Sequence, residues 1–150
     1  MNKILIKLLA LTACLILITS CGTTHKATNA SQTDNNPGIE VKVWPERNGG
    51  APDALELTIK NNTSQVIQFG ANYLIERFVN GEWIAMDLGN FAVIAIMYNL
   101  QPGDSGKYTI ALFTENVAYP EGDYRVVKQI NIGEESGQPF YANFKIIEPR

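Results

Sequence analysis

Apolar and polar residues alternate in short segments from residue 39 onward. Side chains that repeat every two residues share one face of a strand, so this alternation predicts strands with one buried face. The segments are Ile39–Trp44, Leu55–Lys60, Val66–Phe69, Tyr108–Leu112, Tyr124–Ile130 and Phe140–Ile146. Residues 39–150 show no helical periodicity, and the pattern therefore predicts an all-β domain.

Turn residues separate these segments at short intervals. Asn80 and Gly81 stand between Tyr73–Val79 and Glu82–Met86. Asn-Gly adopts the positive φ angles that a two-residue type I′ hairpin turn needs. Further turns are expected at Gly49–Pro52, Asn61–Ser64, Leu100–Ser105 and Glu134–Gly137. Seven or eight antiparallel strands in the 112 residues from Ile39 to Arg150 are typical of a β-sandwich.

One apolar run, from Phe91 to Tyr98, does not alternate. It fits a strand that is covered on both faces, or a strand and its loop packed onto the core. It also fits an exposed patch that docks a partner, because monomers seldom display large apolar patches. In that second interpretation the candidate interaction residues are Phe91, Ile94, Ile96 and Tyr98. Tyr98 would be the anchor, since its rigid ring and polar tip suit interfaces.

The first 20 residues have a different pattern. Lys3 and Lys7 precede an apolar stretch, Leu8–Ile18, which is too short to span a bilayer comfortably. It ends in Ile18-Thr19-Ser20-Cys21, which resembles the lipobox of bacterial lipoproteins. In that family the signal peptide is cut before the cysteine, whose sulfur receives a diacylglycerol. The resemblance implies a signal peptide over residues 1–20, lipidation at Cys21 and a permanent membrane anchor.

A second cysteine leaves an alternative open. Leu11-Thr12-Ala13-Cys14 also fits a lipobox, although cleavage there would leave an apolar start to the mature chain. An uncleaved apolar anchor that contains both cysteines is the other possibility. Cys21 is favoured, because a polar stretch follows it. Both cysteines lie in this leader, so the domain is expected to be stable without a disulfide.

Residues 21–38 are interpreted as a lipidated cysteine and a tether. Gly22–Asn36 has no large apolar residue, which predicts disorder, and it holds the only histidine, His25. The charge of the chain is mildly acidic. Cleavage would remove Lys3 and Lys7 and leave ten basic against fifteen acidic residues, a formal charge of −5. This balance argues against nucleic acid as a partner.

The domain, residues 39–150, lacks the residue types that most catalytic and metal sites use. It has no cysteine and no histidine, which excludes Cys/His and Ser/His/Asp machinery and metal sites built from those ligands. Two carboxylate pairs occur, Glu134-Glu135 and Glu121 with Asp123, and neither is assigned a catalytic role. Glu134–Gly137 is interpreted as a solvated turn. We therefore expect no catalytic residues, no metal and no cofactor, and we do not expect an enzyme.

Trp44 and Trp83 are expected to pack in the core or at a sheet edge, with stacking on a sugar as the alternative. The stretch Glu121–Val126 resembles the start of an immunoglobulin F strand, in which a tyrosine hydroxyl bonds back to the corner. Tyr124 takes the tyrosine position and Val126 that of the usual cysteine. Arg125 is expected to pair with a nearby carboxylate. Tyr124, Trp83, Asn80 and Gly81 are thus assigned structural roles.

A wider resemblance covers nearly the whole domain. Its motifs are Ile59–Asn62, Phe69-Gly70 with Tyr73, Leu74 and Glu76, then Asn80–Trp83, Leu100–Gly103 and Gly122–Val126. The domain resembles bacterial immunoglobulin-like domains of small secreted proteins and lipoproteins, and more distantly the BsuPI-type proteinase inhibitors. The resemblance implies an immunoglobulin-like antiparallel β-sandwich.

The expected function is a non-catalytic interaction module of the cell envelope. It would be extracytoplasmic, held to a membrane by its N-terminal lipid, and would contact a protein or peptide through loops or a sheet face. Which membrane carries it stays open. One alternative is a BsuPI-like inhibitor that presents residues 101–105 or 112–120 to a protease. Another is a cell-wall or glycan-binding module that uses Trp44 or Trp83.

Overall fold

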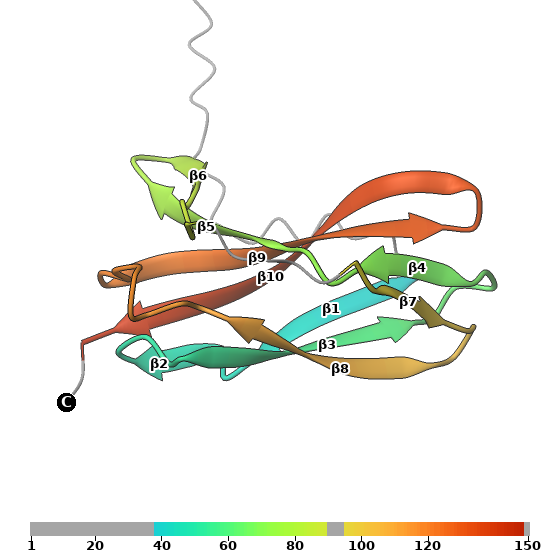
Figure 1. Ribbon diagram of the computed structural model, residues 1–150, viewed down its shortest axis with the longest axis horizontal. Helices are drawn as coiled ribbons and strands as arrows, with labels where there is room; N and C mark the ends of the chain where they lie inside the picture. Colours follow the sequence, from blue (N-terminus) through green and yellow to red (C-terminus); the bar gives the residue numbers. More distant parts are fainter. Residues whose placement is uncertain (1–37, 90–94, 149–150) are drawn as a thin grey trace, which may run out of the picture.

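The computed structural model describes residues 38–89 and 95–148, which form two packed β-sheets (Figure 1). The smaller sheet has three antiparallel strands in the order β1-β3-β8. They are β1 (Ile39–Trp44), β3 (Ala54–Asn61) and β8 (Ser105–Ala111). The expected all-β immunoglobulin-like sandwich is confirmed. Within the described residues there is no helix long and apolar enough to cross a membrane.

The larger sheet has seven strands, and its main path is β2-β10-β9-β4-β7. These strands are β2 (Arg47–Gly49), β10 (Glu135–Ile147), β9 (Gly122–Ile132), β4 (Ile67–Gly70) and β7 (Met97–Leu100). A hairpin of β5 (Leu74–Val79) and β6 (Glu82–Ala85) pairs with β9 through β5. All pairs are antiparallel except β2 with β10, which run parallel over three residues.

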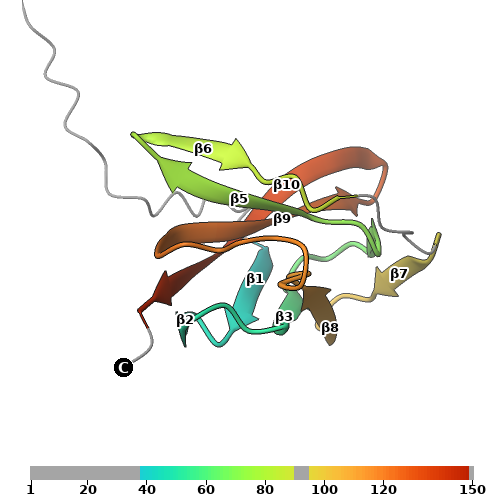
Figure 2. The ribbon, with the colours of Figure 1, turned by 60° about the vertical axis from the view of Figure 1, so that its left-hand side comes forward.

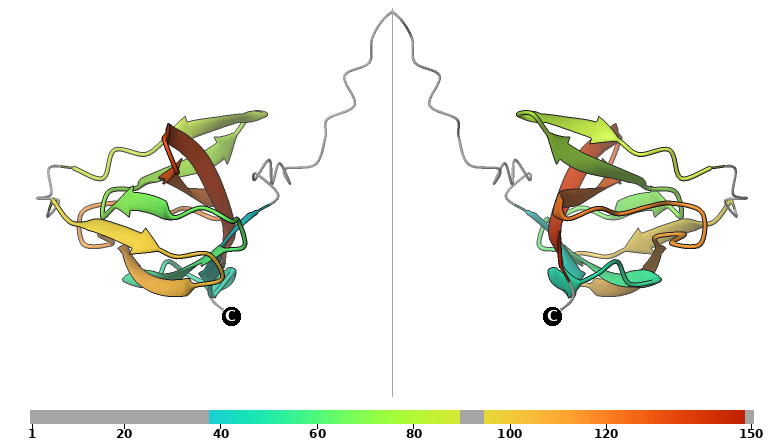
Figure 3. Two further views of the ribbon diagram at one scale, coloured as in Figure 1. Left: turned by 90° about the vertical axis from the view of Figure 1, so that its right-hand side faces the viewer. Right: turned by 90° about the vertical axis from the view of Figure 1, so that its left-hand side faces the viewer.

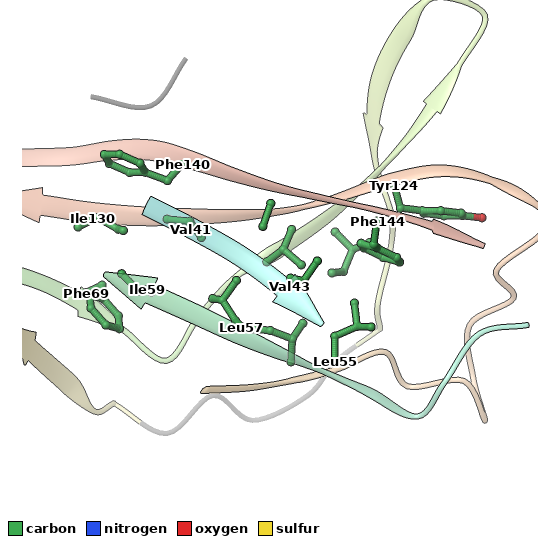
Figure 4. Close-up of a cluster of buried hydrophobic side chains, with 14 of the residues drawn as sticks. Val41, Val43, Leu55, Leu57, Ile59, Phe69, Tyr124, Ile130, Phe140 and Phe144 are labelled. Atoms are coloured by element: carbon green, nitrogen blue, oxygen red, sulfur yellow. The ribbon is translucent and has the colours of Figure 1, made fainter. Parts of the chain in front are cut away.

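The core lies between the two sheets and follows the predicted alternation (Figure 4). Strand β1 buries every second residue, and β3 does the same from Leu55 to Asn61. The opposite layer comes from β9 and β10. The labelled core side chains are Val41, Val43, Leu55, Leu57, Ile59, Phe69, Tyr124, Ile130, Phe140 and Phe144. Apolar burial from two layers thus supplies the main stabilisation of the domain.

A buried asparagine closes one end of the sandwich. The side chain of Asn61 donates to the carbonyl oxygens of Gln65 at 2.8 Å and Leu100 at 3.0 Å. Its carbonyl oxygen accepts from the backbone and the hydroxyl of Thr63. Buried polar groups cost free energy unless they are paired. Asn61 is fully paired, and it ties the end of β3 to β7.

The hairpin turn forms at Asn80 and Gly81. Their φ angles are 53° and 92°, both positive as a type I′ turn requires. Val79 pairs with Glu82 across the turn. The hairpin stands away from the body of the sandwich (Figure 2). The loop that the sequence predicts therefore sets the register of β5 and β6.

The described residues contain ten strands, more than the seven or eight expected. The additional strand β2 comes from a segment with no alternation, because its pairing with β10 is made by backbone groups alone. The last turn is also shorter than expected. Glu135 already pairs with Ile132, so only Gly133 and Glu134 turn the chain and Glu135–Gly137 belong to β10. The shift in register between Glu135 and Gln138 is a bulge, which no apolar pattern shows.

Candidate functional site

In the described part of the apolar run, a strand begins at Met97. Phe91 and Ile94 lie outside the described residues. Ile96 and Met97 are exposed, at 42% and 57%. Strand β7 pairs with β4 on one edge, and no other strand of the described residues pairs with its second edge. We call Ile96 and Met97 the β7 surface.

Tyr98 turns inward from this surface. Its ring centroid lies 4.9 Å from that of Tyr108 on β8 and 5.6 Å from that of Phe69 on β4. Phe69 and Tyr108 lie 5.1 Å apart, edge to face. Such pairs stabilise beyond the area that they bury. Tyr98 therefore joins the two sheets and is half-buried, while its neighbours Ile96 and Met97 carry the exposed apolar area.

A cavity of about 350 Å³ opens beside Tyr98, between β7 and β8. The two strands belong to different sheets and lie on the same side of the molecule (Figure 3, yellow and orange). We call it the β7–β8 cavity. Its lining is Ala71, Tyr98, Lys107, Tyr108, Thr109, Ile110 and Lys128. Burial lowers the pKa of Lys128 to about 8, and burial, with Tyr98 nearby, raises the pKa of Tyr108.

Trp44 lies on the outer face of the smaller sheet and is 70% exposed. The prediction that Trp44 packs in the core or at a sheet edge is therefore wrong. Trp44 takes an outward position at the end of β1, in the same outward-facing row as Glu40 and Lys42. A groove of about 310 Å³ adjoins it, which we call the Trp44 groove. The groove is lined by Glu40, Lys42, Val43, Trp44, Glu46, Thr58, Lys60 and Ser105.

Trp83 instead packs against an arginine. The guanidinium carbon of Arg125 lies 4.3 Å from the Trp83 ring centroid and 4.0 Å from that of Tyr141. Arg125 Nε also donates to Glu76 Oε2 at 2.6 Å, and both side chains are largely buried. Arg125 thus pairs with a local carboxylate, as expected. The stacking of Arg125 on Tyr141 was not expected. It depends on the register between β9 and β10, which the sequence does not show.

Tyr124 is fully buried at the start of β9. Its hydroxyl donates to the carbonyl oxygen of Pro120, and its ring stacks on Phe144 with centroids 5.4 Å apart. The guanidinium carbon of Arg77 lies 5.8 Å from the Tyr124 ring centroid, and Arg77 also donates to the carbonyl oxygen of Glu121 at 3.1 Å. These contacts hold the corner that leads into β9.

The two loops considered for protease binding are held by their own contacts. In 101–105, the amide of Asp104 donates to the carbonyl of Gln101 at 3.0 Å, and Asp104 Oδ2 accepts from the Gln101 amide. In 112–120, both Leu112 and Tyr119 are buried and fix the ends of the loop. These contacts fix the shape of both loops. Within residues 38–89 and 95–148, no three His, Cys, Asp or Glu side chains gather to hold a metal ion.

Comparison with solved structures finds several similar chains. A structural genomics target is 16% identical with a TM-score of 0.47, covering 75% of this chain and 88% of that one. A protein assigned as ApaA from Bordetella pertussis is 18% identical with a TM-score of 0.43, covering 75% and 91%. A β-glucosidase from Listeria innocua is 17% identical with a TM-score of 0.33, and only 16% of that enzyme is covered.

Comparison with curated proteins finds no match. The family model described as bacterial Ig-like domain matches residues 35–145. The match spans both sheets and nearly all of the described strands. The chain therefore belongs to the bacterial Ig-like domain family.

Proposed function

We propose that this protein is a lipid-anchored, extracytoplasmic interaction module that binds a protein or peptide and catalyses no reaction. The proposed binding site is the β7 surface. The observation that carries the proposal is the exposure of Ile96 and Met97 beside the edge of β7 that no described strand covers. Proteins usually protect such edges with charge, proline or a covering segment, because an unpaired strand is a template for another chain.

The binding mode that fits this edge is strand addition. An extended peptide would pair with the backbone of β7 and continue the larger sheet beyond β4 and β7. Met97 would then contact the peptide on one face. On the other face, alternate peptide side chains would point toward the β7–β8 cavity. Backbone pairing supplies affinity in this mode, and the cavity supplies selectivity.

The test is capture of a partner from detergent-solubilised envelope by immobilised protein. Met97→Asp places a charge on the β7 surface, and Leu74→Asp is the matched control, because Leu74 is 51% exposed on β5. We expect a partner that the wild type and Leu74→Asp retain and Met97→Asp loses. Retention by both variants, or loss with Leu74→Asp alone, would contradict binding at β7.

The lipid anchor is proposed from the leader, which lies outside the described residues. The order of charged start, apolar core, lipobox and polar tether supports lipidation of Cys21. Cells that express the full chain would be fed labelled palmitate. We expect label in the wild type and in Cys14→Ser, and none in Cys21→Ser. Label that is lost with Cys14→Ser and kept with Cys21→Ser would move the anchor to Cys14.

Glycan binding is a second candidate, which the exposure of Trp44 favours. An exposed tryptophan ring beside hydroxyl and charged side chains can stack on a sugar while these side chains bond its hydroxyls. Soluble cell-wall glycan fragments should then shift the indole N–H resonance of Trp44 and leave that of Trp83 in place. Two unchanged indole resonances across the fragments would remove this candidate.

A further inference from the structure

Lys128 occupies a core position. It lies on the inner face of β9, in the same alternating row as Tyr124, Val126 and Ile130, and only 3% of the residue is exposed. Removing an ammonium group from water costs free energy unless other polar groups replace the water. The contacts of Lys128 therefore show which polar groups replace the water and whether the ammonium group can bind a further one.

The ammonium of Lys128 has two acceptors in the protein. Nζ donates to the carbonyl oxygen of Asn72 at 2.7 Å and to that of Gly70. It also lies 5.4 Å from the centroid of the Phe69 ring. Both acceptors are neutral, and within the described residues no carboxylate forms an ion pair with Nζ. One of its three N–H donors and its charge therefore remain for a further group.

The β7–β8 cavity gives access to this ammonium. Its lining contains two lysines, Lys128 and Lys107, and no carboxylate among the described residues. Lys107 pairs with Glu56 at 2.7 Å on the exposed face of the smaller sheet. The chain as a whole has a net charge of −3, so a cavity lined by cations runs against its general charge. A buried positive group beside an open cavity favours an anionic occupant.

We infer that the β7–β8 cavity binds the carboxylate of an acidic side chain, with Lys128 as its counter-ion. The inference rests on the proposed function, because it assigns that carboxylate to the peptide that adds to β7. Side chains alternate along a strand, so a peptide in this position directs every second side chain toward the cavity. The charge of the cavity then selects a peptide with Asp or Glu at one of these positions.

The inference is tested with two small probes that differ only in the charged group, N-acetyl-glutamate N-methylamide and N-acetyl-glutamine N-methylamide. The full chain, isotope-labelled at its lysine side chains, is titrated with each probe and the Lys128 resonance is followed by NMR. We expect the glutamate probe to bind at least about tenfold more tightly at pH 7. Equal affinity for the two probes would overturn the inference, and so would inorganic phosphate that binds as tightly as the glutamate probe.

The pH profile gives a second measurement on the wild-type protein. With the pKa of Lys128 near 8, affinity for the glutamate probe should fall by about tenfold per pH unit above that value. The other titratable groups that line the cavity are Lys107, Tyr98 and Tyr108, whereas β4 and β10 present Phe69 and Phe140 to Lys128. A constant affinity from pH 7 to 10 would contradict a role for Lys128.

Lys128→Met removes the charge and keeps the length of the side chain, and it should abolish the preference for glutamate. Lys145→Met is the control, because Lys145 is a solvent-exposed lysine that does not line the cavity, and it should change the affinity by less than about threefold. If Lys128→Met does not fold, the probe pair and the pH profile of the wild type still decide the question. Capture lost with Met97→Asp but no preference for glutamate would leave the proposed function standing without this inference. Preference for glutamate without any effect of Met97→Asp on capture would support carboxylate binding in the cavity and contradict binding at β7.

Discussion

Tyr119 carries a buried hydroxyl that has no hydrogen-bond partner within the described residues. Burial, and to a lesser degree Tyr73 and Tyr124, raise the pKa of Tyr119 well above its usual value. A buried polar group without a partner destabilises the folded protein, so replacing it with an apolar group removes that penalty. Tyr119→Phe should therefore leave the free energy of unfolding unchanged or raise it by up to about 1 kcal/mol.

The matched variant is Tyr124→Phe, at the other end of the same aromatic contact. Tyr119 and Tyr124 lie 5.5 Å apart, but only the hydroxyl of Tyr124 has an acceptor, the carbonyl of Pro120. Tyr124→Phe should lower the free energy of unfolding by about 1 to 2 kcal/mol. Denaturant unfolding measures both variants. A loss of similar size in both would mean that Tyr119 has a partner after all.

Lys128 makes the stability of the protein depend on pH. Its pKa is about 8 in the folded protein and 10.5 for an ordinary lysine. Between these values the unfolded chain binds a proton that the folded protein does not, so stability rises as the pH increases. Burial raises the pKa of Tyr73 and Tyr108, which keep a proton that the unfolded chain releases. Above about pH 10 stability therefore falls again.

The expected rise between pH 8 and 10 is roughly 1 to 2 kcal/mol in the free energy of unfolding. Denaturant midpoints at intervals across this range would record it. Lys128→Met should remove the rise, whatever it does to stability at pH 7, and the exposed Lys107→Met should keep it. A flat profile in the wild type would show that the folded protein does not lower the pKa of Lys128.

At the residue scale the sequence predicts the apolar core but not the contacts that cross it. The alternation that places Tyr124, Val126 and Ile130 inside places Lys128 inside as well. Its acceptors lie 58 and 56 residues away, at the last residue of β4 and in the loop that follows it. A local sequence pattern does not predict hydrogen bonds between residues so far apart in the chain. The charged cavity therefore becomes apparent only once β9 is known to lie beside β4.

Strand positions were easiest to predict where a strand has one buried face. Strands β1, β3, β9 and β10 contain their alternating segments in full, and β8 contains Tyr108–Leu112 except for its last residue. The run 91–98 was harder, because an apolar run without alternation does not say where a strand begins. Strand β7 starts at Met97 and ends at Leu100, inside the stretch that the sequence assigned to a turn. Pairing with β4 sets those limits, since Ile67 lies opposite Leu100.

The β5–β6 hairpin depends on Arg125 of β9. The guanidinium stacks between Trp83 and Tyr141 and pairs with Glu76, so one side chain connects β5, β6, β9 and β10. Lysine keeps the charge but loses the planar stack and the fork of donors. Arg125→Lys should therefore loosen the hairpin without unfolding the sandwich.

Hydrogen exchange is the measurement for this variant. We expect the protected amides of Glu82–Ala85 to exchange about tenfold faster in Arg125→Lys, while those of β3 and β10 keep their rates. Arg47→Lys on β2 is the control, because Arg47 is exposed. Faster exchange throughout the protein would show instead that Arg125 stabilises the whole fold.

For the whole molecule, the two sheets share one core but meet differently on their two sides. On one side β1 of the smaller sheet packs against β10 of the larger sheet. On the other side β8 and β7 are not hydrogen-bonded to each other, and side chains close the space between them. The aromatic cluster of Phe69, Tyr98 and Tyr108 bridges this side. The proposed site thus lies where aromatic side chains connect the two sheets.

Tyr98 decides between the two interpretations of the apolar run, because its ring belongs to that bridge. Tyr98→Ala removes contacts to both sheets and should lower the free energy of unfolding by about 2 to 3 kcal/mol. Tyr98→Phe keeps the ring and should be close to the wild type. Since both sheets lose the same contact, thermal unfolding of Tyr98→Ala should remain a single transition at a lower temperature. A Tyr98→Ala protein as stable as the wild type would mean that the ring faces a partner rather than the core, and that Tyr98 belongs with Ile96 and Met97 on the exposed surface.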